Sequence, residues 1–197
     1  MLFLYSPYRI TEYLLVSILL SVSLNCRADF LFSADATSVQ GSLTSTTTST
    51  QTQTYLDIGL MLGLSSKSQI YFGTIYLNSE INERNLSGVT TIMSIQDLLI
   101  GTKYFFGKDR AFNMTAAYGV LSRAHYKNGS SATETWTGSS TLFKIAYTPM
   151  ITQRASIGVA ISYYQASYIK KEVSSVATSY SGSKSFLIPM LSLNFYF

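Results

Sequence analysis

The sequence predicts an all-β fold, a transmembrane antiparallel up-and-down β-barrel of eight strands. Three observations carry this prediction: low charge with dispersed apolar residues, eight strand-like segments, and polar connections of alternating length. The chain of 197 residues is 47% hydrophobic and only 12% charged, about half the roughly 25% charge that is usual in globular proteins. No stretch carries the ~20 consecutive apolar residues of a transmembrane helix. Alternating strands that cross a membrane account best for this composition.

The first 28 residues have the features of a secretory signal. Arg9 supplies a positive start, residues 13–24 an apolar stretch, and residues 26–28 an approximate small-x-small cleavage site. The expected organisation is a signal peptide at 1–28 and a barrel at 29–197. An alternative makes Cys26 the acylated first residue of a lipoprotein. Because Cys26 is the only cysteine, we expect neither a disulfide framework nor a cysteine-based metal site.

Eight segments have the alternation or the β-forming residues of strands. The first alternates poorly, whereas most exceed the 9–11 residues that a tilted strand needs to cross a bilayer. The expected strands are residues 29–40, 54–64, 69–81, 91–106, 111–126, 134–149, 155–170 and 184–197.

Large apolar residues fall on one face of the strands and small or polar residues on the other. In the second strand, YLDIGLMLGL places its leucines and its isoleucine on one side and Asp57 with two glycines on the other. The fifth, sixth and seventh strands repeat this pattern. Because too few charges exist to solvate an outer surface, the apolar face is expected to contact lipid and the small, polar face to line a crowded lumen.

The connections between these segments are expected to alternate in length. Short polar turns, SSKS, GKDR and ITQR, separate strands two and three, four and five, and six and seven. Longer polar stretches fill the other gaps, which is typical of barrels with tight periplasmic turns and longer extracellular loops. The loops at 41–53 and 171–183 are therefore the candidate surfaces for an extracellular ligand.

Charged residues on the polar faces form a candidate site in the lumen. Ionisable groups at membrane depth are costly unless they are paired, so they point to function or to a paired core. One interpretation is an ion pathway; the other is a salt-bridged interior that keeps the barrel closed, which an eight-stranded lumen favours because it is only wide enough for side chains. The expected lumen charge network is Asp57, Asp97, Lys103, Arg123 and Lys144.

Aromatic residues gather near the short-turn ends of the strands. Such residues prefer the boundary between membrane and water, although their strand propensity offers an ordinary explanation. The expected periplasmic aromatic girdle is Tyr104, Phe106, Phe112 and Tyr147, with Phe105 and Tyr196 nearby.

The last segment, KSFLIPMLSLNFYF, alternates to its final residue. With this ending, the strand number and the loop pattern, residues 29–197 resemble the small eight-stranded outer-membrane barrels of bacteria, the outer-membrane protein A/X/W-like superfamily. The resemblance implies export to the bacterial outer membrane, contact with its lipid, and recognition of the terminal strand by the barrel-assembly machinery. The positions matching that assembly signal are Leu191, Leu193, Phe195 and Phe197.

Pro189 departs from the family pattern, since proline removes a ladder hydrogen bond. It is expected to mark a β-bulge or, as in a resembling palmitoyl-transferring barrel, a lateral gap for a lipid tail.

The expected function is structural or one of surface interaction, without enzymatic activity and without a cofactor or metal. One alternative is a lipid A-modifying enzyme, hydrolase or transferase, built on His125 with Ser122 and Glu134; the spacing departs from that of the lipid A deacylases. The other is a narrow, porin-like channel for small solutes. The basic residues are scattered, so nucleic acid is not an expected partner.

Overall fold

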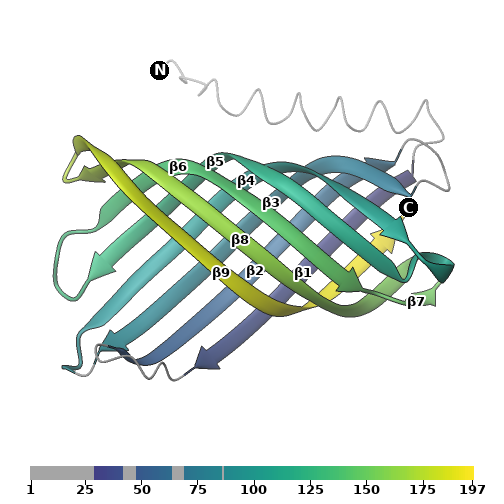
Figure 1. Ribbon diagram of the computed structural model, residues 1–197, viewed down its shortest axis with the longest axis horizontal. Helices are drawn as coiled ribbons and strands as arrows, with labels where there is room; N and C mark the ends of the chain where they lie inside the picture. The colour runs from purple at the N-terminus through teal and green to yellow at the C-terminus, as the bar shows by residue number, and fades with distance from the viewer. Residues whose placement is uncertain (1–28, 42–47, 64–68, 86) are drawn as a thin grey trace, which may run out of the picture.

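The structure, a computed structural model, describes residues 29–41, 48–63, 69–85 and 87–197. The predicted signal peptide, including Cys26, lies outside these residues. Within them the chain forms eight long strands, one short strand and one 3-10 turn (Figure 1). The elements are β1 (Asp29–Gly41), β2 (Thr48–Gly63), β3 (Ile70–Asn85), β4 (Thr90–Phe106), η1 (Lys108–Arg110), β5 (Phe112–Asn128), β6 (Glu134–Tyr147), β7 (Met150–Thr152), β8 (Ala155–Val173) and β9 (Val176–Tyr196).

Each long strand pairs antiparallel with its neighbours in the chain, and β1 pairs with β9 to close the sheet into a barrel. At the seam, the Phe30 N–H donates to the Phe197 carbonyl (3.2 Å) and the Phe197 N–H donates to the Phe30 carbonyl (2.9 Å). The prediction of an all-β, eight-stranded, up-and-down antiparallel barrel is confirmed. β7 pairs only with the start of β8 and lies outside the ring. No helix in the described residues is long and apolar enough to cross a membrane.

The strands are strongly tilted, as Figure 1 shows. Starting at Ser185 on β9, we can step from each residue to its partner on the next strand, once around the ring. The path returns to β9 at Phe195, so the strands are staggered by ten residues (185 to 195). The path runs through Gln165, Thr141, Tyr118, Ile100, Thr74, Leu60 and Phe32. A stagger of this kind is what tilts the strands of a closed barrel.

The wall of the barrel is apolar outside and largely polar or small inside. On β8, Ile157, Val159 and Ile161 are exposed, whereas Ala160 and Ser162 are buried. The outward apolar band ends sharply on the side where β8 runs into β9. There the outward side chains change from Tyr163 to Gln165 on β8 and from Leu187 to Ser185 on β9. This polarity is the reverse of that of a water-soluble barrel, and it suits a wall surrounded by lipid.

Much of the expected loops at 41–53 and 171–183 belongs to strands. β8 and β9 continue beyond the apolar band and meet at Ser174 and Ser175, so the prediction of a loop at 171–183 is wrong. Both serines have positive φ angles, 48° and 68°, which are the angles of a tight hairpin turn. In the predicted loop 41–53, residues from Thr48 onward belong to β2. Threonine, valine and tyrosine favour strands in polar surroundings as well. Low apolarity was therefore not a sufficient criterion for placing loops in these segments.

Pro189 lies in neither a β-bulge nor a fully paired ladder. The pairing of β9 with β8 passes through Ile161–Pro189 without a shift in register, so the predicted bulge is wrong. Phe197 bonds to β1 while Tyr196 bonds toward β8, and hydrogen-bonding direction alternates along a strand. The nitrogen of Pro189 therefore faces β1, just beyond Ala36–Leu191, the last β1–β9 pair. The proline occupies a local free edge, where the missing donor breaks no bond.

Candidate functional site

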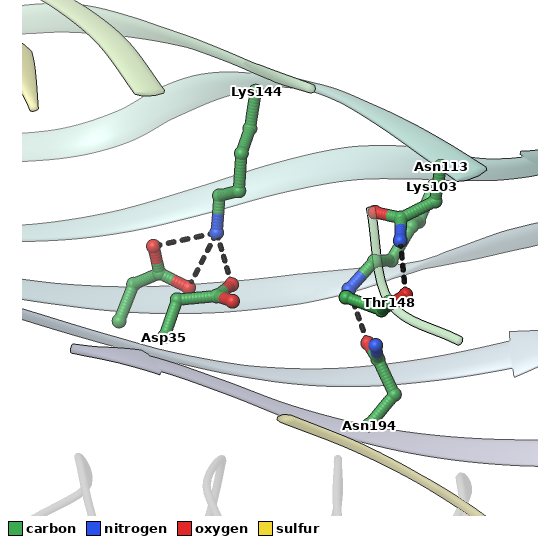
Figure 2. A network of polar contacts seen from close by, with 7 residues as sticks. Asp35, Lys103, Asn113, Lys144, Thr148 and Asn194 are labelled. Atoms are coloured by element: carbon green, nitrogen blue, oxygen red, sulfur yellow. Dashed lines mark hydrogen bonds and ion pairs between the residues drawn. The ribbon is translucent and has the colours of Figure 1, made fainter. Parts of the chain in front are cut away.

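A buried ion triad occupies the middle of the lumen. Lys144 on β6 pairs with Asp35 on β1 and donates to both carboxylate oxygens of Asp57 on β2, at 2.9 and 2.7 Å (Figure 2). All three side chains are at most 2% exposed. The triad joins strands from different parts of the ring, so it ties the walls of the barrel together across its axis.

Lys103 on β4 forms a second polar layer nearer the end that holds the described termini. Its amine donates to the Asn194 side-chain oxygen, and Asn194 in turn donates to Ser156 (3.1 Å). Figure 2 shows a neighbouring pair, in which Asn113 donates to Thr148 (2.8 Å). The amine of Lys103 also lies 5.6 Å from the centre of the Phe105 ring.

Asp97 forms a third layer on the other side of the triad. It accepts hydrogen bonds from Ser140 and from the hydroxyl of Tyr164 (2.7 Å). Hydrogen bonds of this kind offset part of the desolvation cost of burying the carboxylate.

Aromatic clusters lie inside the barrel near both of its ends. At the end of the termini, Tyr71, Phe105 and Tyr196 pack together, and Tyr71 donates to Asp29 (2.6 Å) and accepts from Arg110 (3.1 Å). Phe105 and Tyr196 thus belong to the interior and not to an outer girdle. At the opposite end, Trp136 packs against three tyrosines, Tyr126, Tyr168 and Tyr180.

These layers place four of the five predicted lumen charges inside the barrel: Asp57, Asp97, Lys103 and Lys144. Only Asp57 and Lys144 are in direct contact; Asp97 and Lys103 each have neutral partners. Asp35 and Asn194 complete the layers and were not predicted. The alternation of Leu31, Ser33 and Asp35 could have identified Asp35, because it places all three on one face.

Arg123 does not belong to the lumen, and the prediction that it points inward is wrong. It is exposed, between the buried Ser122 and Ala124. In β5, Val120 and Leu121 both face outward, and the pairing shifts register between Gly119 and Ser122. This β-bulge adds one residue and reverses the alternation beyond it.

The residues proposed for lipid A chemistry are not assembled into a site. Ser122 faces the lumen and is 1% exposed, whereas His125 lies on the outer face, where its Nδ1 is 3.2 Å from the Thr135 hydroxyl. Glu134 faces inward and binds Trp136 and Lys171. Nucleophile, base and acid must be within hydrogen-bond reach, and here the barrel wall separates the serine from the histidine. The described residues hold no group of three metal-ligating side chains.

The predicted girdle residues form a continuous strip on the outer wall. The rings of Tyr104 and Phe106 are 5.8 Å apart, Phe106 and Phe112 5.7 Å, and Phe112 and Tyr147 5.0 Å. On β9, Leu191 and Phe195 are exposed on the outer face and Leu193 is half-buried there; Phe197, the residue after the strand, is also exposed. Phe195 and Phe197 contact the rings of Phe32 and Phe30.

No family model matches the sequence, and no curated protein matches it. Among solved structures, the chain is similar to Neisserial surface protein A, NspA, with 13% identity and a TM-score of 0.45 over 86% of this chain and 99% of that chain. It is similar to the outer membrane protein OprG from Pseudomonas aeruginosa, with 13% identity and a TM-score of 0.42 over 87% and 97%. A third structure, OmpT, an outer membrane protein of Vibrio cholerae in a trimer form, has 14% identity and a TM-score of 0.29 over 86% and 52%. By its own strand pairing and the polarity of its wall, the chain has the architecture of the small bacterial outer-membrane β-barrel proteins.

Proposed function

We propose that this protein is an integral β-barrel of the bacterial outer membrane that does not conduct solutes and acts through its outer surface. The observation that carries the proposal is the buried triad of Lys144, Asp35 and Asp57. A lysine held by two carboxylates across the lumen takes the place that a permeant ion would need.

The position of the other polar groups supports the same function. Lys103 and Asp97 are each bound to neutral partners, and aromatic side chains pack at both ends of the interior. A channel of eight strands has room for little besides side chains, which argues against the alternative of a solute pore. The separation of Ser122 from His125 across the wall argues against an acyl-modifying enzyme.

Outer-membrane placement rests on the apolar band and on the terminal strand. Export by the leader at 1–28 and assembly through Leu191, Leu193, Phe195 and Phe197 are parts of this proposal. Interaction with an extracellular partner would then fall to the projecting β8–β9 hairpin, whose exposed residues beyond the band are mostly polar, with Ile169 and Val176 as apolar exceptions.

Fractionation of cells, combined with heat-modifiable migration in detergent gels, tests the placement. The protein is expected in the outer-membrane fraction, with a faster-migrating unboiled form. Liposomes that contain the purified protein should swell in small sugars no faster than empty liposomes. Recovery in the soluble periplasmic fraction would refute the membrane assignment, and rapid swelling would refute the closed lumen.

A further inference from the structure

β-bulges place two cations, Arg123 and Lys170, on the outer wall, between the apolar band and the end of the barrel that carries the β8–β9 hairpin. On β5 the bulge at Val120–Leu121 turns Arg123 outward, as described above. On β8 the register shifts between Tyr168 and Lys170, and both Ile169 and Lys170 are exposed. Strict alternation from the start of each strand would have pointed both cations into the lumen. Bulges re-aim side chains and are frequent beside functional sites.

The two cations lie in one row across three neighbouring strands. Arg123 pairs with Thr137 on β6, and Thr137 pairs with Lys170 on β8. The backbones of Arg123 and Lys170 are two strand spacings apart, about 10 Å. Both side chains are long enough to reach across this distance, so their charged ends can meet over Thr137.

Most of the positive charge in this row is free to bind an anion. Arg123 makes no hydrogen bond or ion pair with the described residues. Lys170 has a loose contact with Glu172, at 4.0 Å between exposed groups, and such surface pairs contribute little. Lys127 adds a further positive charge on the outer face of β5.

A groove of about 460 Å³ lies on the outer wall beside this row. Thr137, Ser139 and Lys170 line its polar part, and the exposed side chains of Tyr118, Val120 and Ile169 line its apolar part. Gly138 keeps the groove floor close-packed, because a Cβ there would lie 1.9 Å from the Ser167 carbonyl oxygen. A groove that joins cations to apolar side chains suits an amphiphile with an anionic head.

We propose that Arg123 and Lys170 bind the phosphate group of a lipid in the surrounding leaflet, with part of its hydrocarbon lying in the groove along Tyr118 and Val120. A soluble phosphate ion would use the cations but not the apolar lining. Arg123 is the first outward side chain beyond Val120 and Leu121 on β5, which suits the depth where lipid head groups meet the hydrocarbon. Arginine is well suited to bidentate phosphate contacts. The inference rests on the proposed function, since it requires the wall to face lipid.

Native mass spectrometry of the purified protein in detergent, titrated with dioleoyl phosphatidic acid or dioleoyl phosphatidylcholine, tests this site. The test variant is R123Q/K170Q. The matched control is K108Q/R154Q, which removes two exposed cations from the opposite end of the barrel. The unmodified protein should prefer phosphatidic acid, and R123Q/K170Q should bind it about tenfold more weakly, since two charge-assisted contacts are lost. K108Q/R154Q and the charge-conserving R123K/K170R should retain most of the binding.

Each other outcome identifies what has failed. Equal binding of the two lipids, or unchanged binding by R123Q/K170Q, would overturn the site. Displacement of phosphatidic acid by equimolar inorganic phosphate would assign the site to a soluble anion and overturn the lipid. Heat-modifiable migration of every variant reports the folded barrel, and if R123Q/K170Q fails to fold, the single variant R123Q is measured in its place. A protein that never enters detergent micelles or bilayers would refute the proposed function itself.

Discussion

Lys144 is the residue on which the closed interior most depends. The change Lys144→Met leaves the carboxylates of Asp35 and Asp57 buried without their cation. Removing one partner of a buried ion pair costs about 3–5 kcal/mol, so the urea concentration that unfolds the barrel should fall markedly. The measurement is the loss of the fast-migrating gel form as urea increases.

The matched control for this change is Lys108→Met, at an exposed position in η1, which should leave the midpoint unchanged. The triple variant D35N/D57N/K144M removes all three charges together and should recover much of the loss. A Lys144→Met barrel as stable as the unmodified one would show that the triad is not a structural tie.

Glu134 and Trp136 provide a titratable reporter at the outer end of β6. Burial raises the pKa of the Glu134 carboxyl, but hydrogen bonds from Lys171 and Trp136 outweigh it and hold this pKa below its ordinary value of 4.5. A carboxyl whose pKa is lower in the folded than in the unfolded state stabilises the fold at pH values above its unfolded-state pKa. This stabilisation is lost as the pH falls through the folded-state pKa. Fluorescence of Trp136, the only tryptophan, should therefore stay constant from neutral pH to 4.5 and change below it.

The change Glu134→Gln should abolish this fluorescence transition, because the charged acceptor of the Trp136 N–H is lost. Glu80→Gln, on the outer face of β3, should preserve it. A midpoint above pH 4.5, or a transition that persists in Glu134→Gln, would contradict the assignment.

At the residue scale, period-two alternation predicted the faces of Asp57, Asp97, Lys103 and Lys144 but failed at Arg123. The failure has a physical cause: a bulge inserts one residue into the ladder, and the sequence GVLSR carries no mark of it. Partners across the lumen, such as Asp35 for Lys144, depend on closure of the ring and not on local pattern. These pairings could not be inferred before the stagger was known.

The outward face of β9 is the element that the assembly proposal concerns. The double change Phe195→Ala/Phe197→Ala keeps the backbone pairing with β1 but removes the two terminal aromatic rings. If the assembly machinery reads these rings, the amount of heat-modifiable barrel in the outer membrane of cells should fall severalfold. Refolding of the same variant in detergent should be much less affected.

Ile157→Ala/Val159→Ala on β8 is the control for this experiment, since it removes comparable outward apolar side chains from a neighbouring strand. Equal losses in both variants would mean that lipid contact, and not recognition of β9, limits assembly.

At the element scale, the existence and order of all eight strands could be predicted, but their outer boundaries could not. Low apolarity indicated loops at 171–183, whereas β8 and β9 run on to a two-residue turn. Backbone pairing extends a hairpin wherever its residues tolerate extended conformation, whether or not lipid surrounds it. Pro189 also could not be explained locally, because its nitrogen faces a stretch of β1 that β9 no longer pairs.

At the scale of the whole molecule, scarcity of charge and dispersed apolarity were sufficient to predict a membrane-spanning barrel. The structure adds that the described lumen holds a buried ion triad, hydrogen-bonded charges and aromatic rings, while Arg123 and Lys170 lie on the outer wall. In the proposed function the two surfaces have separate tasks: the interior holds the barrel closed, and the exterior would contact lipid and any partner.

Planar-bilayer recording on the purified protein tests the closed interior most directly. With Lys144, Asp35 and Asp57 joined across the lumen, bilayers that contain folded protein should show no steady conductance above the bare membrane. The triple variant D35A/D57A/K144A, which empties the middle layer, is recorded in the same way. Any increase in its conductance is measured against the unmodified protein. Stable, stepwise currents from the unmodified protein would contradict the account.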